Sequence, residues 1–349
     1  MYPQQIIDAL SHVRYPGTGN DLIQSGMLED DIRISGLQVS FSLIFDKEND
    51  PFMKSVLKAA EVAVHTYIDP NAAVTIHTKF RKTTNSSPSS VQPSIAPHII
   101  AIHSGKGGVG KSTVTANLAI ALAKRGFRVG LLDADIHGPS MPKMFHTEDC
   151  RPVSYEEEGG RTLIEPIEQY GVRMLSIGFF VDPESAVVWR GAMASNAIKQ
   201  LIQDAHWGEL DYFLIDLPPG TSDIHLTLVQ TLQLTGAIVV TTPQPVALVD
   251  ARKGVDMFRN DKINIPVLGL IENMAWFTPA ELPENKYYIF GRDGGKQLAQ
   301  DLQVPLLGQI PLVQSIREAG DDGMPIAMQD GHPAAKMFDE IVDSLIDND

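Results

Sequence analysis

The stretch that decides the fold runs from residue 99 to residue 113 and reads IIAIHSGKGGVGKST. It starts as an apolar run and ends in a match to the pattern G-x-x-x-x-G-K-[ST], which joins a strand to a helix. Glycines at these positions let the backbone turn its N–H groups toward phosphate oxygens. A helix that begins here adds the positive end of its dipole. The stretch therefore predicts a phosphate-binding loop.

The side chains of this loop have separate predicted tasks. Lys111 places a cation on the β- and γ-phosphates of ATP, and the Ser112 hydroxyl is a ligand of Mg²⁺. The predicted nucleotide-binding residues of the loop are Gly105, Lys106, Gly107, Gly108, Val109, Gly110, Lys111, Ser112 and Thr113.

Acidic side chains end two further apolar segments, 131–140 (LLDADIHGPS) and 212–221 (YFLIDLPPGT). In a parallel sheet such strand ends face the ligand crevice. Asp216 ends its strand as a Walker B aspartate does, and we expect it to hold Mg²⁺ directly or through water. The loop 218–220 that follows suits a γ-phosphate sensor. Asp133 either supports the loop and the metal site or is an ordinary turn residue.

Asn273 follows another apolar segment, in the sequence LIENM at 270–274. Its amide offers a donor and an acceptor, the pair needed to read the edge of adenine. The alternative is an ordinary turn asparagine. The chain lacks the Asn/Thr-Lys-x-Asp sequence typical of GTP-binding proteins, which favours ATP.

The order of apolar segments predicts an α/β fold with a doubly wound, mainly parallel sheet over residues 98–349. Helices fit between the strands at 111–125 and 247–260. A small α+β domain is expected over 1–80, and the Ser-, Thr- and Pro-rich residues 81–97 suit a flexible linker. The predicted strands of the larger domain are 98–103, 128–132, 172–176, 212–215, 236–241, 266–271 and 306–310.

The charge and the apolar content of the chain indicate which binding partners and which location to expect. The chain carries 28 basic and 43 acidic residues, a net charge of −15, which disfavours binding to nucleic acid or to anionic membranes. No apolar run reaches about 18 residues, so no membrane span is predicted. The N-terminus lacks the layout of a signal peptide, so a cytoplasmic protein is the expectation.

The segments 105–113, 133–140, 216–223 and 272–274 together closely resemble the Mrp/ApbC family of ATP-dependent iron–sulfur cluster carriers. Lys106 gives the two-lysine loop of the wider MinD-like class of ATPases. The resemblance implies a homodimeric, slow ATPase, with Lys106 reaching the partner's nucleotide and Asp135 positioning or activating the attacking water. Lys106, Lys111 and Asp135 are thus the predicted catalytic residues. Residues 1–80 resemble the MIP18-like domain often fused to this family.

Cysteine content departs from the family pattern. Members typically carry Cys-x-x-Cys shortly after the Asn-Met pair, whereas residues 274–283 here read MAWFTPAELP, and Cys150 is the one cysteine. Thiolates are the usual cluster ligands. Two hypotheses therefore stay open: a carrier that delivers clusters to apo-proteins, or a nucleotide-switched scaffold for apo-proteins or assembly factors that holds no cluster. A MinD-like positioning ATPase is a third, disfavoured by charge and by the lack of a basic amphipathic tail.

Overall fold

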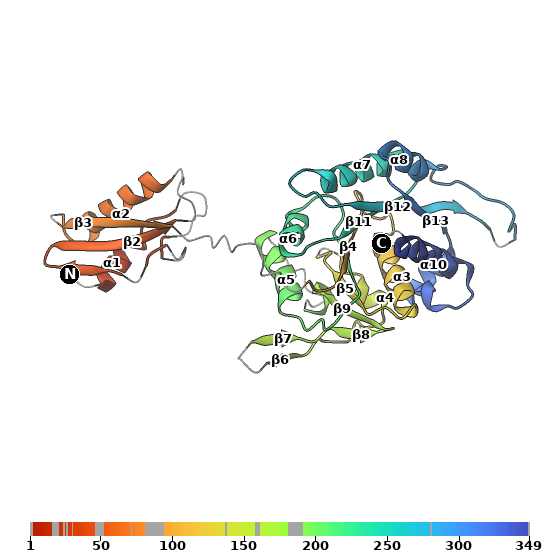
Figure 1. The fold of residues 1–349 in the computed structure, drawn as a ribbon, viewed down its shortest axis with the longest axis horizontal. Helices are drawn as coiled ribbons and strands as arrows, with labels where there is room; N and C mark the ends of the chain where they lie inside the picture. Colours follow the sequence, from red (N-terminus) through yellow and green to blue (C-terminus); the bar gives the residue numbers. More distant parts are fainter. Residues whose placement is uncertain are drawn as a thin grey trace. The chain divides into compact units, whose positions relative to one another are not determined.

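The computed structural model divides the chain into two compact units, residues 1–92 and 93–349. Each unit is described by itself (Figure 1). His137 and residues 81–93 of the predicted linker lie outside the described residues. These are 3–15, 21–23, 25, 27–29, 31–45, 52–70, 72–80, 94–136, 138–157, 161–180, 191–279 and 281–347.

The first unit is a three-stranded sheet with two helices, as the sequence predicted. The strands run in the order β1-β2-β3, with β1 antiparallel and β3 parallel to β2. On β2, alternate residues Val39, Phe41, Leu43 and Phe45 are buried because side chains alternate between the faces of a strand. The elements are α1 (Pro3–Leu10), β1 (Arg33–Ser35), β2 (Gln38–Phe45), α2 (Met53–Tyr67) and β3 (Ala73–Phe80).

The second unit is built on an eight-stranded sheet in the order β13-β12-β11-β4-β10-β5-β9-β8. All neighbouring pairs are parallel except β8 and β9 at one edge, which confirms the predicted mainly parallel sheet. The strands are β4 (His98–His103), β5 (Val129–Asp133), β8 (Ile167–Gln169), β9 (Val172–Ser176), β10 (Tyr212–Asp216), β11 (Gly236–Thr241), β12 (Val267–Phe277) and β13 (Leu306–Leu312).

The predicted elements of this unit are all present, with small differences at their ends. The predicted strand 266–271 continues to Phe277 in β12, and the predicted helix 111–125 ends one residue earlier, at Lys124. The edge strand β8 and the hairpin of β6 (Ser154–Glu156) and β7 (Thr162–Ile164) were not predicted, because these strands are too short to show a period in the sequence.

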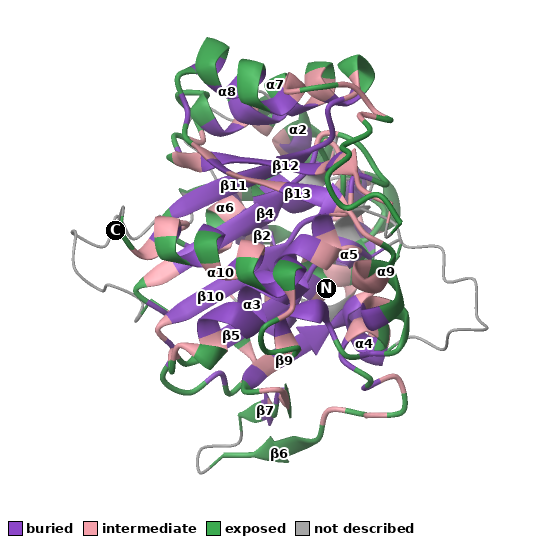
Figure 2. Ribbon diagram, turned by 90° about the vertical axis from the view of Figure 1, so that its right-hand side faces the viewer, coloured by how far each residue is buried: buried purple, intermediate pink, exposed green. Residues whose placement is uncertain are grey.

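Helices cover both faces of the sheet, so the central strands are buried throughout (Figure 2). On β4, Ile100 and Ile102 pack on the face that carries α3 and α10, and Ile99 and Ala101 pack on the opposite face. The helices are α3 (Lys111–Lys124), α4 (Met141–Met144), α5 (Gly191–Gln203), α6 (Asp223–Thr231), α7 (Pro245–Arg259), α8 (Gly294–Leu302), α9 (Gln314–Asp321) and α10 (Pro333–Ile346). Within the described residues, no helix has the length and apolar character needed to cross a membrane.

Candidate nucleotide-binding site

The predicted phosphate loop connects the carboxyl end of β4 to the first turn of α3. Gly108 and Gly110 have φ of +80° and +83°, which side chains other than glycine rarely adopt. Gly105 is fixed for another reason: a Cβ there would lie 2.2 Å from the carbonyl oxygen of Asp250 on α7. The spacing of the glycines therefore reflects both the curl of the loop and the closeness of a neighbouring helix.

Asp216 is the centre of the polar contacts below this loop. It ends β10 and is fully buried, and its carboxylate accepts hydrogen bonds from residues of α3. Lys111 Nζ and Ser112 Oγ each lie 2.6 Å from Asp216 Oδ2. The Lys111 side chain is itself only 6% exposed, so the two charges compensate each other out of water. The structure thus brings together the predicted phosphate cation and both predicted magnesium ligands.

Thr115 completes this cluster and was not identified from the sequence. It is buried one turn into α3, and its Oγ1 lies 2.7 Å from Asp216 Oδ1. The same hydroxyl lies 3.0 Å from the Lys111 carbonyl, the usual partner of a threonine within a helix. A threonine four residues after the loop lysine faces the same side of the helix, and only that spacing could have indicated it.

We expect Thr115→Val to destabilise the larger unit by about 1–3 kcal/mol, because it keeps the volume but removes a hydrogen bond to a buried carboxylate. The matched control is Thr231→Val in α6, where the hydroxyl bonds only to the Thr227 carbonyl. Thermal unfolding measures both. Equal midpoints for the two variants would contradict a special role for the Thr115 hydroxyl.

Asp133 lies opposite Asp216 on the adjacent strand β5 and has no exposed surface. It accepts hydrogen bonds from Ser176 Oγ at 2.9 Å and from the backbone N–H groups of Asp135 and Met141. Burial, and then the nearby Asp216 carboxylate, raise the pKa of Asp133 to about 7. These bonds hold the loop after β5 in place, which fits the supporting role rather than the turn residue.

Asp135 is half-buried and follows two residues later in the same loop. Its backbone N–H is tied to Asp133 Oδ1 at 3.2 Å, so the buried carboxylate sets where this residue stands. Asp135 is thus tied through its backbone to Asp133, which pairs with Asp216 across the neighbouring strands. Its predicted catalytic task stays a prediction.

Asn273 reaches the phosphate loop itself. Its side-chain Nδ2 donates to the Val109 carbonyl at 2.8 Å, and a Cβ on Gly110 would come within 2.2 Å of that nitrogen. The next residue, Met274, has φ of +55°, a strained conformation for a side chain of this size. The bend after Asn273 therefore helps to place its amide between β12 and the loop, an arrangement that the sequence alone did not indicate.

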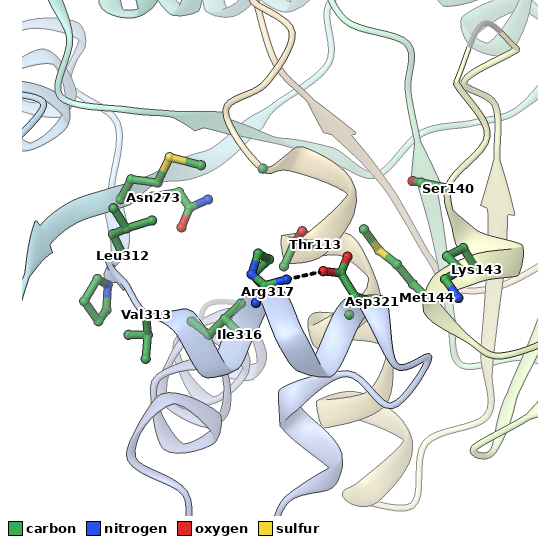
Figure 3. Close-up of a pocket in the computed structure, with 14 residues that line it drawn as sticks. Thr113, Ser140, Lys143, Met144, Asn273, Leu312, Val313, Ile316, Arg317 and Asp321 are labelled. Carbon is green, nitrogen blue, oxygen red and sulfur yellow. Dashed lines mark hydrogen bonds and ion pairs between the residues drawn. The ribbon is translucent and has the colours of Figure 1, made fainter. Parts of the chain in front are cut away.

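A cavity of about 460 Å³ opens beside Asn273 and the start of α3 (Figure 3). Its walls combine apolar side chains with a few polar groups, as ligand pockets commonly do. Among the described residues, Ser140 Oγ is a buried hydroxyl with no hydrogen-bond partner. The lining residues are Gly110, Thr113, Ser140, Lys143, Met144, Asn273, Met274, Pro311, Leu312, Val313, Ile316, Arg317, Gly320 and Asp321.

Lys106 is exposed on the outer part of the loop, unlike Lys111. The predicted sensor loop lies near it: a Cβ on Gly107 would stand 3.9 Å from Pro219 Cγ. The N–H of Gly220 donates to the Ser104 carbonyl at 2.9 Å. The sensor loop and the phosphate loop are thus in direct contact at the carboxyl edge of the sheet.

Cys150 is half-buried in the turn after α4. Within the described part of the chain, no group of three or more His, Cys, Asp or Glu residues is placed to hold a metal ion. In residues 274–279, where the family typically has its cysteines, the Lys286 Nζ atom lies 3.9 Å from the centre of the Trp276 ring. The backbone of Phe277 pairs with that of Tyr287 in an antiparallel bridge. The side chains of this segment support an aromatic turn.

The parallel sheet, the glycine loop and the aspartate at the end of β10 define a P-loop NTPase. A cell-division ATPase, MinD of Pyrococcus furiosus, has the same fold, with a TM-score of 0.51 at 24% identity over 72% of this chain and 99% of that one. Residues 96–346 match the model of the NUBPL iron-transfer P-loop NTPases, and residues 3–76 match that of an iron–sulfur cluster assembly protein domain. The chain belongs to this iron-transfer NTPase family, and the resemblance found in the sequence is confirmed.

Relatives cover most of the chain. An iron–sulfur cluster carrier protein of Synechocystis is 40% identical over 95% of this chain and 92% of its own length. The iron–sulfur cluster transfer protein NUBPL of Mus musculus is 44% identical over 71% of this chain and 76% of its own. A nucleotide-binding protein of Archaeoglobus fulgidus, solved with ADP, has a TM-score of 0.58 at 35% identity, covering 69% of this chain and 90% of that one.

Proposed function

We propose that the chain binds ATP with Mg²⁺ and hydrolyses it to ADP and phosphate as a step in iron–sulfur cluster transfer. The observation that carries the proposal is the cluster in which Lys111 and Ser112 both contact Asp216. Such a lysine neutralises phosphate oxygens, and backbone N–H groups of the loop cradle them. The ADP in the Archaeoglobus relative supports a nucleotide as the ligand.

The residues present fit Mg²⁺. This ion prefers oxygen ligands and is usually held by one or two protein groups together with nucleotide phosphates. Ser112 offers a hydroxyl and Asp216 a carboxylate at one place, 2.6 Å apart. When bound, the ion would neutralise charge on the phosphates. In the structure Lys111 stands at Asp216, so nucleotide and metal must draw this lysine toward the phosphates.

The nucleoside fits the cavity beside Asn273. The cavity begins at Gly110 and Thr113, where the phosphate loop becomes helix, and continues between β13 and α9. An adenine base there would find apolar contacts from Pro311, Leu312 and Ile316. The Asn273 carbonyl oxygen is the acceptor that remains after Nδ2 has donated to Val109.

For hydrolysis, we propose that Asp135 orients or activates water, and that Lys106 acts on the nucleotide of a second copy. Lys106 is exposed and Lys111 is buried, as expected if one lysine serves another chain and the other its own nucleotide. The chain would then act as a homodimer that tightens with ATP and relaxes after hydrolysis.

The proposal of cluster transfer to apo-proteins is supported by the relatives named as carrier and transfer proteins and by the two matching family models. A nucleotide-switched scaffold that holds no cluster is the second candidate. The absence of cysteine from residues 274–283 favours it, because Cys150 would supply only one thiolate per chain. Both candidates share the same nucleotide site and differ in what the protein carries.

Anaerobic reconstitution with iron and sulfide separates these candidates. After removal of free iron, we expect less than stoichiometric iron on the purified chain and no difference between wild type and Cys150→Ser. The measurements are iron content and the visible absorbance of the cluster. Stoichiometric iron that is lost in Cys150→Ser would instead show that two copies share a cluster, and would restore the carrier role.

A further inference from the structure

Two buried histidines connect the phosphate loop to the sensor loop. His103 ends β4, directly before the loop, and has no exposed surface. His225 lies in the first turn of α6 and is 2% exposed. Their rings meet at 82° with His225 Nε2 3.3 Å from His103 Nδ1. The two histidines are 122 positions apart in the sequence, so this contact is a product of the fold.

The hydrogen bond from Ser222 indicates the tautomer of His225. His225 Nδ1 accepts from the backbone N–H of Ser222 at 3.1 Å, so the proton of a neutral His225 is on Nε2. His103 Nδ1 lies 3.3 Å from this Nε2–H, and the Pro218 carbonyl in the sensor loop is a second acceptor for His225. Burial is the main cause that lowers the pKa of His103 to about 3 and of His225 to about 4, so both rings are neutral near pH 7.

His225 also bonds to Ser222, the residue that caps the N-terminus of α6 directly after the sensor loop. By bonding to Ser222, it takes the place that Glu has in a capping box at a helix start, three residues after the cap. The segment 217–222, which contains the sensor loop 218–220, is therefore held at both of its ends. Ser222 at one end bonds to His225, and at the other end the Leu217 N–H donates to the Ile102 carbonyl of β4 at 3.1 Å. Between these points, Gly220 is bonded to Ser104.

The far side of His103 leaves the ring little room to move. Its Nε2 has no hydrogen-bond partner among the described residues, and a Cβ on Gly254 of α7 would come within 2.6 Å of it. Phe258 meets the same ring edge-on at a centroid distance of 5.4 Å. An unpaired buried ring nitrogen costs free energy, so a role for the pair other than stability explains why it is tolerated.

We propose that His103 and His225 are a positioning pair that holds the segment 217–222, which contains the sensor loop 218–220, against the phosphate loop in the arrangement needed for hydrolysis. This inference rests on the proposed ATPase function. The hydrogen bonds of the pair lead to Ser222, and Ser104 follows His103 in the chain and bonds to Gly220, so the pair acts on the loops through Ser104, Gly220 and Ser222. Its loss should affect the rate of hydrolysis more than the affinity for nucleotide.

Two asparagine variants test the bond between the two histidines, because one variant keeps this bond and the other loses it. His103→Asn keeps an acceptor near the position of Nδ1, so the bond from His225 is retained. His225→Asn keeps the acceptor for Ser222 but is too short to reach His103. We expect kcat to fall about tenfold in His225→Asn with KM changed less than about threefold, and wild-type-like values in His103→Asn. His103→Leu, which removes the acceptor, should behave as His225→Asn does.

Hydrogen exchange at the Gly220 amide gives a readout that needs no hydrolysis. It should be faster in His225→Asn and His103→Leu than in wild type and His103→Asn. Equal kcat and equal exchange in all four proteins would overturn the pairing role. A wild-type protein without ATPase activity would count against the proposed function alone, and the exchange comparison would then decide the role of the pair.

Discussion

Lys111→Ala is expected to lower the affinity for ATP by about a hundredfold or more, since a charge-assisted bond to phosphate is lost. Lys111 is the buried cation at the end of the phosphate loop, 2.6 Å from Asp216. Calorimetric titration with ATP and Mg²⁺ measures the effect. The change also leaves Asp216 without its cation, and breaking a buried pair costs about 3–5 kcal/mol of stability. Thermal unfolding must therefore accompany the titration.

Lys124→Ala is the matched control for this experiment. Lys124 lies at the other end of α3 and pairs with the exposed Asp330 at 2.5 Å, far from the loop. Its loss should leave ATP affinity unchanged and alter stability by at most about 1 kcal/mol. A folded Lys111→Ala protein that binds ATP as tightly as Lys124→Ala does would refute the phosphate site, and with it the proposed function.

Asp135→Asn should reduce the rate of ATP hydrolysis by about two to four orders of magnitude, the range for loss of a general base. Nucleotide binding should persist, because the cluster of Lys111, Ser112 and Asp216 is untouched. The protein should then accumulate as a nucleotide-bound dimer. Phosphate release and size-exclusion chromatography with ATP give the two measurements.

Asp149→Asn provides the comparison, since Asp149 is an exposed carboxylate in the turn that follows α4. It should hydrolyse ATP at the wild-type rate. An Asp135→Asn enzyme with the same rate as Asp149→Asn would exclude Asp135 as the residue that acts on water.

The missing cysteines change what the family membership implies. In residues 274–279, Trp276 contacts Lys286 and Phe277 pairs with Tyr287 across the turn, so aromatic side chains lie where the family typically has thiolates. The apolar side chains that follow in this part of the chain are 46–59% exposed: Leu282, Tyr287 and Ile289. Lys111, Ser112 and Asp216 thus lie together in the structure, whereas the cysteines typical of the family are absent from this segment of the sequence, so the reconstitution experiment decides between carrier and scaffold.

The sequence by itself determined the fold class, the phosphate loop and the carboxylates at the strand ends. These features are local: glycines, a lysine and a serine within nine residues specify a loop, and an apolar run that ends in Asp specifies a strand end at the crevice. Their chemistry depends on residue types at short spacings, so no tertiary information was needed to find Lys111, Ser112 and Asp216.

Only the tertiary structure decided how distant segments use these residues. It brought Thr115 to Asp216, the Asn273 amide to the Val109 carbonyl, and His225 to His103, across 101, 164 and 122 positions of sequence. For Thr115, the spacing from Lys111 indicates only the face of the helix, and no spacing rule predicts the other two contacts, because all three depend on which strands are neighbours and on how closely helices approach. The order of the strands in the sheet brings β10 and β12 to the phosphate loop and α3, and the packing of α6 brings His225 to His103 at the end of β4.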